Sequence, residues 1–130
     1  LEVTERCRLL DIGLLRNIIV NLRAKGVRFA LDDFGTGFSS VGIVRDLTFD
    51  TIKIDRSFVI NIEDDNKARE LIGNFTAVAA IFGAKVCVEG IETSEMRDIL
   101  QKYRVTSFQG YFYAKPIPLE DFLNKMAPSQ

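Results

Sequence analysis

The chain has 130 residues, of which 47% are hydrophobic and 27% are charged, a composition typical of one globular domain. Its 17 Lys and Arg residues nearly balance its 18 Asp and Glu residues without a basic block, which disfavours binding to long nucleic acid. It contains no histidine, so its chemistry must use carboxylates, lysine, amides or hard metal ions instead of the commonest general base and zinc ligand.

The sequence carries few signals of compartment. The two cysteines, Cys7 and Cys87, form no spaced framework, so we expect both to be reduced in a cytoplasmic protein, with a bridge between them left open. No apolar run approaches the roughly 20 residues of a membrane-spanning helix. The first residues contain no basic region and no initiator Met, so we expect the chain to begin inside a longer polypeptide, which other domains could tether to a membrane.

Short β-rich runs begin the chain and recur along it. The expected strands are 1–4, 27–31, 51–54, 85–88 and 106–109. Between the first two strands, apolar residues from Leu14 to Leu22 repeat at helical spacing. Gly26 follows this helix and suits the left-handed conformation at a helix end.

The loop after the second strand, residues 33–40, contains Gly35, Gly37 and a pair of serines. The glycines permit unusual backbone angles, and the serines could cap a short helix that follows. We interpret this segment as a functional loop. A dinucleotide-binding fingerprint is disfavoured, because a third glycine at the right distance is missing.

Helical patterns also separate the later strands. An apolar face over residues 71–82 ends at Gly83, Thr93 is expected to cap the next helix, and a last helix is expected behind Pro118. Strands that alternate with helices imply right-handed crossovers and a parallel sheet, hence the α/β class. The strand spacing is compatible with a (β/α)8 barrel or a doubly wound sheet, and residues 1–130 show no internal domain boundary.

Polar residues stand at the strand ends, where parallel α/β folds bind their ligands. They are Glu2, Glu5, Asp32, Asp33, Glu89, Glu92 and Gln109. With a period of two, Lys53 faces the side of its strand opposite to Ile52 and Ile54. A buried lysine and converging carboxylates are costly unless they pair or bind cations, so the pattern predicts a metal site. The alternative, that each acid caps a helix or pairs on the surface, is the common one for a single residue but not for four strands together.

Five motifs follow one another along the chain. They are Leu1-Glu2-Val3-Thr4-Glu5, Leu31-Asp32-Asp33-Phe34-Gly35-Thr36-Gly37-Phe38-Ser39-Ser40, Lys53-Ile54-Asp55-Arg56-Ser57-Phe58-Val59, Val88-Glu89-Gly90-Ile91-Glu92-Thr93 and Gln109-Gly110-Tyr111. Over essentially its whole length the chain therefore resembles the EAL family of cyclic di-GMP phosphodiesterases. The resemblance implies the C-terminal portion, residues 1–130, of a modified TIM-like (β/α)8 barrel with about five β/α units. The family's Glu-Ala-Leu strand and a downstream Asn ligand would precede Leu1.

The resemblance also implies roles for the residues at the strand ends. Glu2, Asp32, Asp33 and Glu89 would bind metal in a site for two Mg2+ or Mn2+ ions. Lys53 would hold the attacking water or a phosphate oxygen, and Glu89 would act as a ligand or as the general base. Two hard cations explain how a site without histidine could cleave a phosphodiester.

Three further residues receive roles from the resemblance. Gln109 would complete the phosphate end of the site, Glu5 would anchor the loop at 33–40, and Glu92 would support its neighbours. The implied reaction is hydrolysis of cyclic di-GMP to linear pGpG by the intact parent domain, with the fragment alone inactive. The parent would form an EAL–EAL dimer and be fused to a sensory or GGDEF domain.

A second hypothesis is left open by the sequence. The parent could be a catalytically degenerate EAL domain that serves as a cyclic di-GMP sensor or a protein-interaction module. The two hypotheses differ in whether the Glu and Asn ligands that would precede Leu1 are intact in the parent.

Overall fold

The centre of the structure is a parallel sheet whose strands follow one another in chain order. The computed structural model describes residues 1–4, 12–36 and 40–126. In this part the sheet has the order β1-β2-β3-β4-β5, formed by β1 (Glu2–Thr4), β2 (Ala30–Phe34), β3 (Thr51–Ile54), β4 (Lys85–Val88) and β5 (Ser107–Phe108). A doubly wound sheet would reverse its strand order, whereas this sheet advances in one direction as consecutive units of a barrel do. The predicted α/β barrel segment is therefore confirmed.

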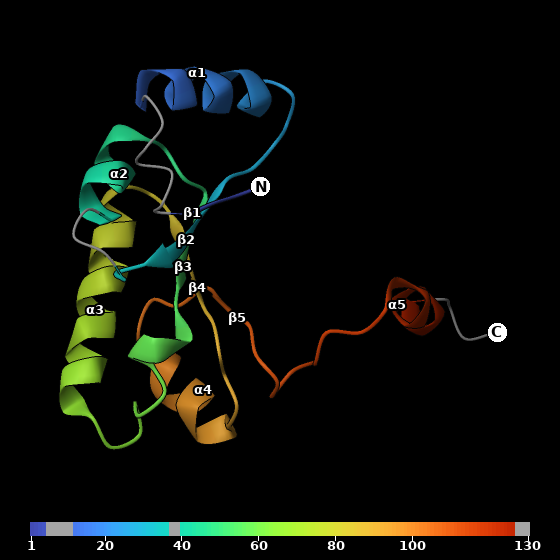
Figure 1. Ribbon diagram of the computed structural model, residues 1–130. Helices are drawn as coiled ribbons and strands as arrows, with labels where there is room; N and C mark the ends of the chain where they lie inside the picture. The colour runs from blue at the N-terminus through green and yellow to red at the C-terminus, as the bar shows by residue number, and fades with distance from the viewer. Residues whose placement is uncertain (5–11, 37–39, 127–130) are drawn as a thin grey trace.

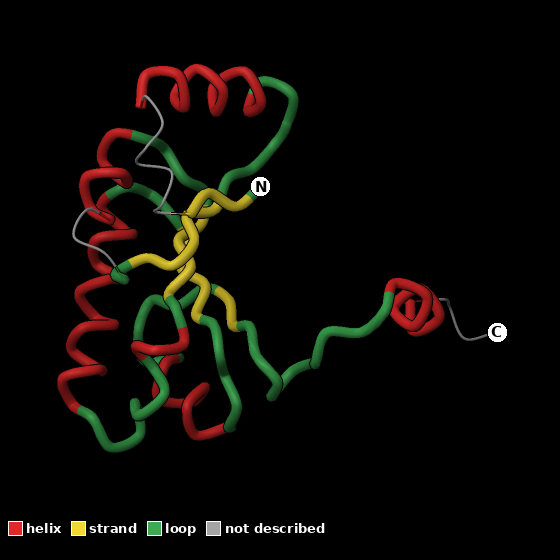
Figure 2. The backbone as a smooth tube through the Cα atoms, in the orientation of Figure 1, coloured by secondary structure: helices red, strands yellow, loops and turns green. Residues whose placement is uncertain are grey.

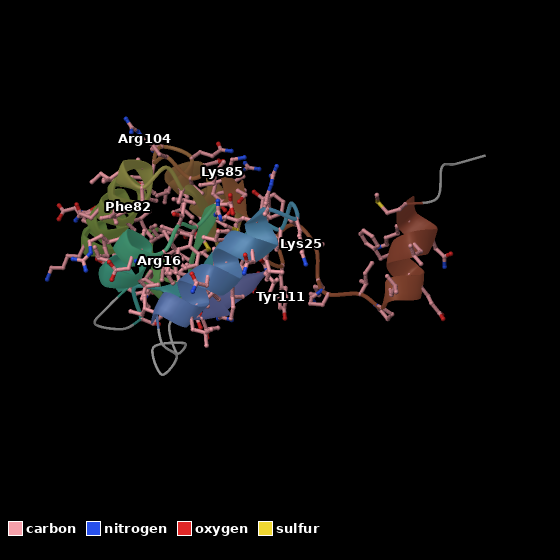
Figure 3. The ribbon with its side chains drawn as sticks, turned by 90° about the horizontal axis from the view of Figure 1, so that it is seen from above. Arg16, Lys25, Phe82, Lys85, Arg104 and Tyr111 are labelled. Atoms are coloured by element: carbon pink, nitrogen blue, oxygen red, sulfur yellow. The ribbon has the colours of Figure 1, made fainter. Side chains whose placement is uncertain are left out.

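Helices connect the strands. They are α1 (Ile12–Arg23), α2 (Ser40–Asp46), α3 (Asn66–Ile81), α4 (Ser94–Leu100) and α5 (Leu119–Met126), with a short 3-10 helix η2 (Arg56–Phe58). Figure 1 shows α2 and α3 along one flank of the sheet and α4 below it, and Figure 2 shows the strands in yellow between α3 and the C-terminal segment. The helix α5 stands apart from the other elements, in the view from above in Figure 3 as well.

The apolar core lies between the sheet and the flanking helices. Ile52 and Ile54 of β3 are completely buried in it, while Lys53 between them faces the other side of the strand, as predicted. Phe75 of α3 packs edge-to-face on Phe34, with ring centroids 5.1 Å apart. The outer face of the sheet therefore packs against helices through apolar side chains, and Lys53 lies on the opposite, inner face.

The predicted ends of the elements agree with the structure in most places. The strands at 51–54 and 85–88 match β3 and β4, and Gly26 and Gly83 follow their helices with φ of 84° and 70°. Thr93 caps α4, since its hydroxyl accepts a hydrogen bond from the Met96 amide. The last helix begins at Leu119, directly behind Pro118.

The second strand differs most from its prediction. The sequence predicts it at 27–31, but β2 spans Ala30–Phe34 because pairing with β3 resumes at Phe34 after a register shift that spans the two aspartates. Before β2 the chain is instead held by Asp50, whose carboxylate accepts from the Phe29 amide at 2.8 Å. The fifth strand is shorter than predicted, Ser107–Phe108 instead of 106–109.

The structure also bears on the cysteines and on membrane-spanning helices. Cys87 is a free, half-buried thiol on β4, and Cys7 lies outside the described residues. Among the helices that the structure describes, none has the length and apolar character needed to cross a bilayer.

Candidate functional site

Lys53 is the centre of a charged cluster on the inner face of the sheet. Its side chain is only 10% exposed, and its Nζ lies 2.7 Å from Glu2 Oε1, 2.7 Å from Glu89 Oε1 and 3.6 Å from Asp32 Oδ1. These carboxylates belong to β1, to β2 and to the residue that follows β4. The structure thus brings together four of the residues that the sequence predicts for the site.

The cluster keeps Lys53 charged. Burial alone lowers the pKa of Lys53, but hydrogen bonds to Glu2 and Glu89 and the charges of Glu89 and Asp32 outweigh it, so the pKa is raised. Lys53 therefore stays a positive charge among the three carboxylates.

The two adjacent aspartates of β2 lie in an irregular part of the strand. The register with β3 shifts between Leu31 and Phe34, and Asp33 has a φ of 56°, in the left-handed region. Its amide donates to Asp32 Oδ1 at 3.0 Å. In a regular strand neighbouring side chains point to opposite faces, and a bulge with a left-handed residue changes this alternation. The register shift and the left-handed Asp33 thus set the backbone conformation at this end of β2, and the sequence pattern did not predict either of them.

The donor chemistry of the cluster suits a hard divalent cation, because all its acidic groups are carboxylates. In this structure, however, the cation between Glu2, Asp32 and Glu89 is the ammonium of Lys53. Within residues 1–4, 12–36 and 40–126 no three Asp, Glu or Cys side chains are arranged to hold a metal ion together. The metal-ligand roles stay predictions.

A hollow adjoins the cluster at the ends of β3, β4 and β5. It is lined by Asp55, Arg56, Glu89, Gly90, Glu92, Gln109, Gly110 and Tyr111. Glu89 belongs both to the hollow and to the cluster around Lys53, so the two form one continuous site. Gln109 and Glu92, both predicted site residues, lie in its wall.

Sequence reasoning assigned no role to several residues of this wall. Arg56 reaches Glu92, with Nη2 3.8 Å from Oε1, and Asp55 caps η2 by accepting from the Ser57 amide at 2.8 Å. Tyr111 is 63% exposed and follows Gln109 by two residues. All three belong to the five motifs of the sequence, and this membership is the feature from which a role in the site could have been predicted. The remaining predicted residue, Glu5, lies outside the described residues.

Comparison with known proteins extends this picture. Probable cyclic di-GMP phosphodiesterase PdeD of Escherichia coli (strain K12) is 39% identical over 130 residues, which cover all of this chain and 24% of PdeD. The crystal structure of the EAL domain of Mycobacterium smegmatis DcpA is 33% identical, with a TM-score of 0.90, over 97% of this chain and 56% of that chain. The Klebsiella pneumoniae BlrP1 manganese/cy-diGMP complex is 30% identical, with a TM-score of 0.75, over 85% of this chain and 28% of that chain.

These matches cover most or all of this chain but only part of each relative. The chain spans about a quarter of PdeD and about half of the DcpA EAL domain structure. The family model of the EAL domain, in contrast, matches residues 1–116, which is most of this chain. The chain belongs to the EAL domain family.

Proposed function

We propose that this chain supplies one part of the active site of a cyclic di-GMP phosphodiesterase, which hydrolyses one phosphodiester bond to give linear pGpG. The observation that carries the proposal is the convergence of Glu2, Asp32 and Glu89 on Lys53 at the inner face of a parallel sheet. Relatives and solved structures that carry this activity or this ligand in their names support the same substrate.

The residues of the cluster, together with the neighbouring Asp33, each have a task in this reaction. Glu2, Asp32 and Asp33 are the residues that would hold Mg2+ or Mn2+, which when bound supplies Lewis acidity and neutralises charge on the phosphodiester. Lys53 places its ammonium where the transition state gathers negative charge. Glu89, hydrogen-bonded to Lys53 Nζ at 2.7 Å, is oriented to accept the proton of the attacking water.

The hollow beside the cluster is the place for the rest of the dinucleotide. Gln109 lies on its wall next to Glu89 and can donate from its amide to a phosphate oxygen. Arg56 and the exposed ring of Tyr111 add a guanidinium and an aromatic face, both suited to a nucleotide.

The parent polypeptide completes the proposal. We place it in the cytoplasm as an EAL–EAL dimer fused to a sensory or GGDEF domain. The fusion is supported by the length of the relatives, of which this chain covers 24% and 16%. A degenerate domain that only binds cyclic di-GMP is the less favoured function, since the carboxylates and the lysine are present together.

The experiment that tests the proposal uses a polypeptide carrying the complete domain. Asp32→Asn removes a ligand charge at constant volume, so hydrolysis of cyclic di-GMP should fall about 100-fold or more, with more Mn2+ needed for half-maximal rate. Asp98→Asn is the matched control, because Asp98 is 60% exposed and pairs with Arg97 on α4. An Asp32→Asn variant with the turnover of the control would refute the ligand role.

A further inference from the structure

Two glycines allow three strand ends to meet in direct contact beside the site. Gly90 follows β4 by two residues, and a Cβ built on it would overlap the Cβ of Arg56, behind β3. Gly110 follows β5, and its Cβ would overlap the backbone nitrogen and oxygen of Ile91. Real Cβ atoms essentially never approach a neighbour below 3.0 Å, so any larger residue would force these segments apart.

Backbone hydrogen bonds fasten the same segments to one another. The Ile91 amide donates to Gln109 O at 3.1 Å, and the Phe112 amide donates to Ile91 O at 3.0 Å. Ile91 is therefore held on both sides by the segment that contains Gly110. On the other side of β4, the Glu89 amide donates to Ile54 O at 3.0 Å.

Each of the three segments carries or adjoins a residue of the site. Lys53 lies three residues before Arg56, Glu89 directly precedes Gly90, and Gln109 directly precedes Gly110. The stack Arg56, Gly90-Ile91, Gly110 thus joins the segments that carry or adjoin these three functional side chains.

The need for a turn does not explain both glycines. Gly26 and Gly83 have φ of 84° and 70° and nothing within 4 Å of a built Cβ, so they serve backbone conformation alone. Gly90 has a φ of 74° and the close contact together, while Gly110 has no positive φ, so only the contact with Ile91 requires a glycine there.

We propose that Gly90 and Gly110 are positioning residues, which hold Glu89 and Gln109 at their working distances from Lys53. The inference rests on the proposed function for the roles of these side chains. A methyl group at either glycine would displace a strand end by a sizeable fraction of an ångström. A misplacement of about 1 Å can cost about 100-fold in rate.

The test compares each alanine variant with a matched control in the complete domain. Gly83→Ala adds the same strain at positive φ as Gly90→Ala but meets no neighbour, and Gly42→Ala is the equivalent control for Gly110→Ala. For cyclic di-GMP hydrolysis, Gly90→Ala should lower kcat between 10- and 100-fold, because a misplacement of up to about 1 Å costs up to about 100-fold in rate. KM should change less than threefold. Gly110→Ala should also raise KM through Gln109. The controls should change kcat and KM less than twofold.

A merely structural role would give a different result. It would lower the folded fraction or the Tm and leave kcat and KM of the folded enzyme at the values of the controls, which would overturn the proposal. A rescue sharpens the test: Arg56→Gly removes the colliding Cβ, so Gly90→Ala in that background should lower kcat less than threefold relative to the Arg56→Gly single variant. An undiminished loss in that background would also count against the proposal.

Two further measurements do not depend on the reaction. Crystal structures should show the 2.7 Å contact between Lys53 Nζ and Glu89 Oε1 broken in Gly90→Ala and kept in Gly83→Ala. If a variant does not fold, hydrogen exchange in the unaltered protein decides: the amides of Ile91 and Phe112 should exchange as slowly as those of β4, and fast exchange would refute the stack. A wild-type domain that fails to hydrolyse cyclic di-GMP would end the proposed function, while the crystal structures would still decide whether Gly90 positions Glu89 against Lys53.

Discussion

Lys53 occupies the position at which the polar side chains of the inner face converge, 2.7 Å from both Glu2 and Glu89. Lys53→Ala should therefore lower kcat for cyclic di-GMP about 100-fold, because a preorganised charge of this kind acts on the transition state. KM should change less than about threefold, since the same charge is needed less in the ground state. Steady-state kinetics of the complete domain measure both, with exposed Lys102 changed to Ala as the control. A raised KM with unchanged turnover would contradict the assignment.

The aspartates of β2 yield a separate prediction on stability. Asp33 has a φ of 56°, which Asn tolerates but Ala does not. Asp33→Ala should therefore be less stable than Asp33→Asn by about 1 kcal/mol in urea unfolding, although both remove the same charge. Equal stability of the two variants would show that the left-handed conformation is not retained in solution.

The period of two predicts the two faces of a regular strand but does not describe the irregular part of β2. The alternation of Ile52, Lys53 and Ile54 predicted the buried and the polar face of β3, because that strand has no irregularity. The same period would send Asp32 and Asp33 to opposite faces. The bulge that changes this alternation depends on pairing with β3, which no local pattern encodes.

At the level of elements, strands with apolar residues bounded by turns were predicted to the residue, as β3 and β4 show. The strand β2 was predicted too early because its apolar run stops at Leu31 while its hydrogen bonds continue to Phe34. The helix η2 was not predicted, since three residues are too short to show a periodicity. Its only local signal is Asp55, placed to cap it.

The cap of η2 makes stability depend on pH. The hydrogen bond with the Ser57 side chain lowers the pKa of Asp55 most, and the backbone amides of Ser57 and Arg56 and the charge of Arg56 lower it further, against a smaller opposing effect of burial. A folded-state pKa below the unfolded value means that the stabilisation is complete above about pH 4 and is lost as pH falls through the folded-state pKa. Asp55→Ala should cost about 1 kcal/mol near neutral pH and clearly less in strong acid.

Urea unfolding of wild type and Asp55→Ala at pH 6 and pH 3 measures this difference. The control is Asp55→Asn, which retains a capping side chain but has no carboxylate, so its own stability should not carry this pH dependence. A loss from Asp55→Ala that is equal at both pH values would mean that the ionised carboxylate is not the capping group.

For the molecule as a whole, motif order predicted the architecture better than local pattern did. The strand and helix signals allowed a barrel or a doubly wound sheet, and the five motifs in series favoured the barrel segment that β1 to β5 form. In the described residues β1 and β5 pair on one side only, so the sheet has two open edges. What covers these edges could not be predicted from a chain that spans about half of the DcpA structure.

Exposed apolar side chains accompany these open edges. On α5 the exposed ones are Leu119, Phe122, Leu123 and Met126, and on α1 they are Ile12, Leu14, Ile18 and Val20. None of the residues of α5 is buried, and Figure 1 shows this helix apart from the sheet. Contiguous apolar surface and unpaired strand edges both favour association with another surface.

The isolated 130-residue chain should therefore self-associate in solution and should not hydrolyse cyclic di-GMP. Multi-angle light scattering over a concentration series should give a mass above that of one chain, which is 14.7 kDa. Leu123→Lys should weaken the association because it places a charge on the apolar face of α5, whereas Asn124→Lys adds the same charge at a polar position of the same helix. A nucleotide assay with Mn2+ on the same samples should detect no pGpG, because the reaction is proposed for a complete domain and this chain spans about half of the DcpA EAL domain structure. A stable monomer that turns over cyclic di-GMP would contradict both halves of this prediction, since its activity would have to arise from Glu2, Asp32, Asp33 and Glu89 alone.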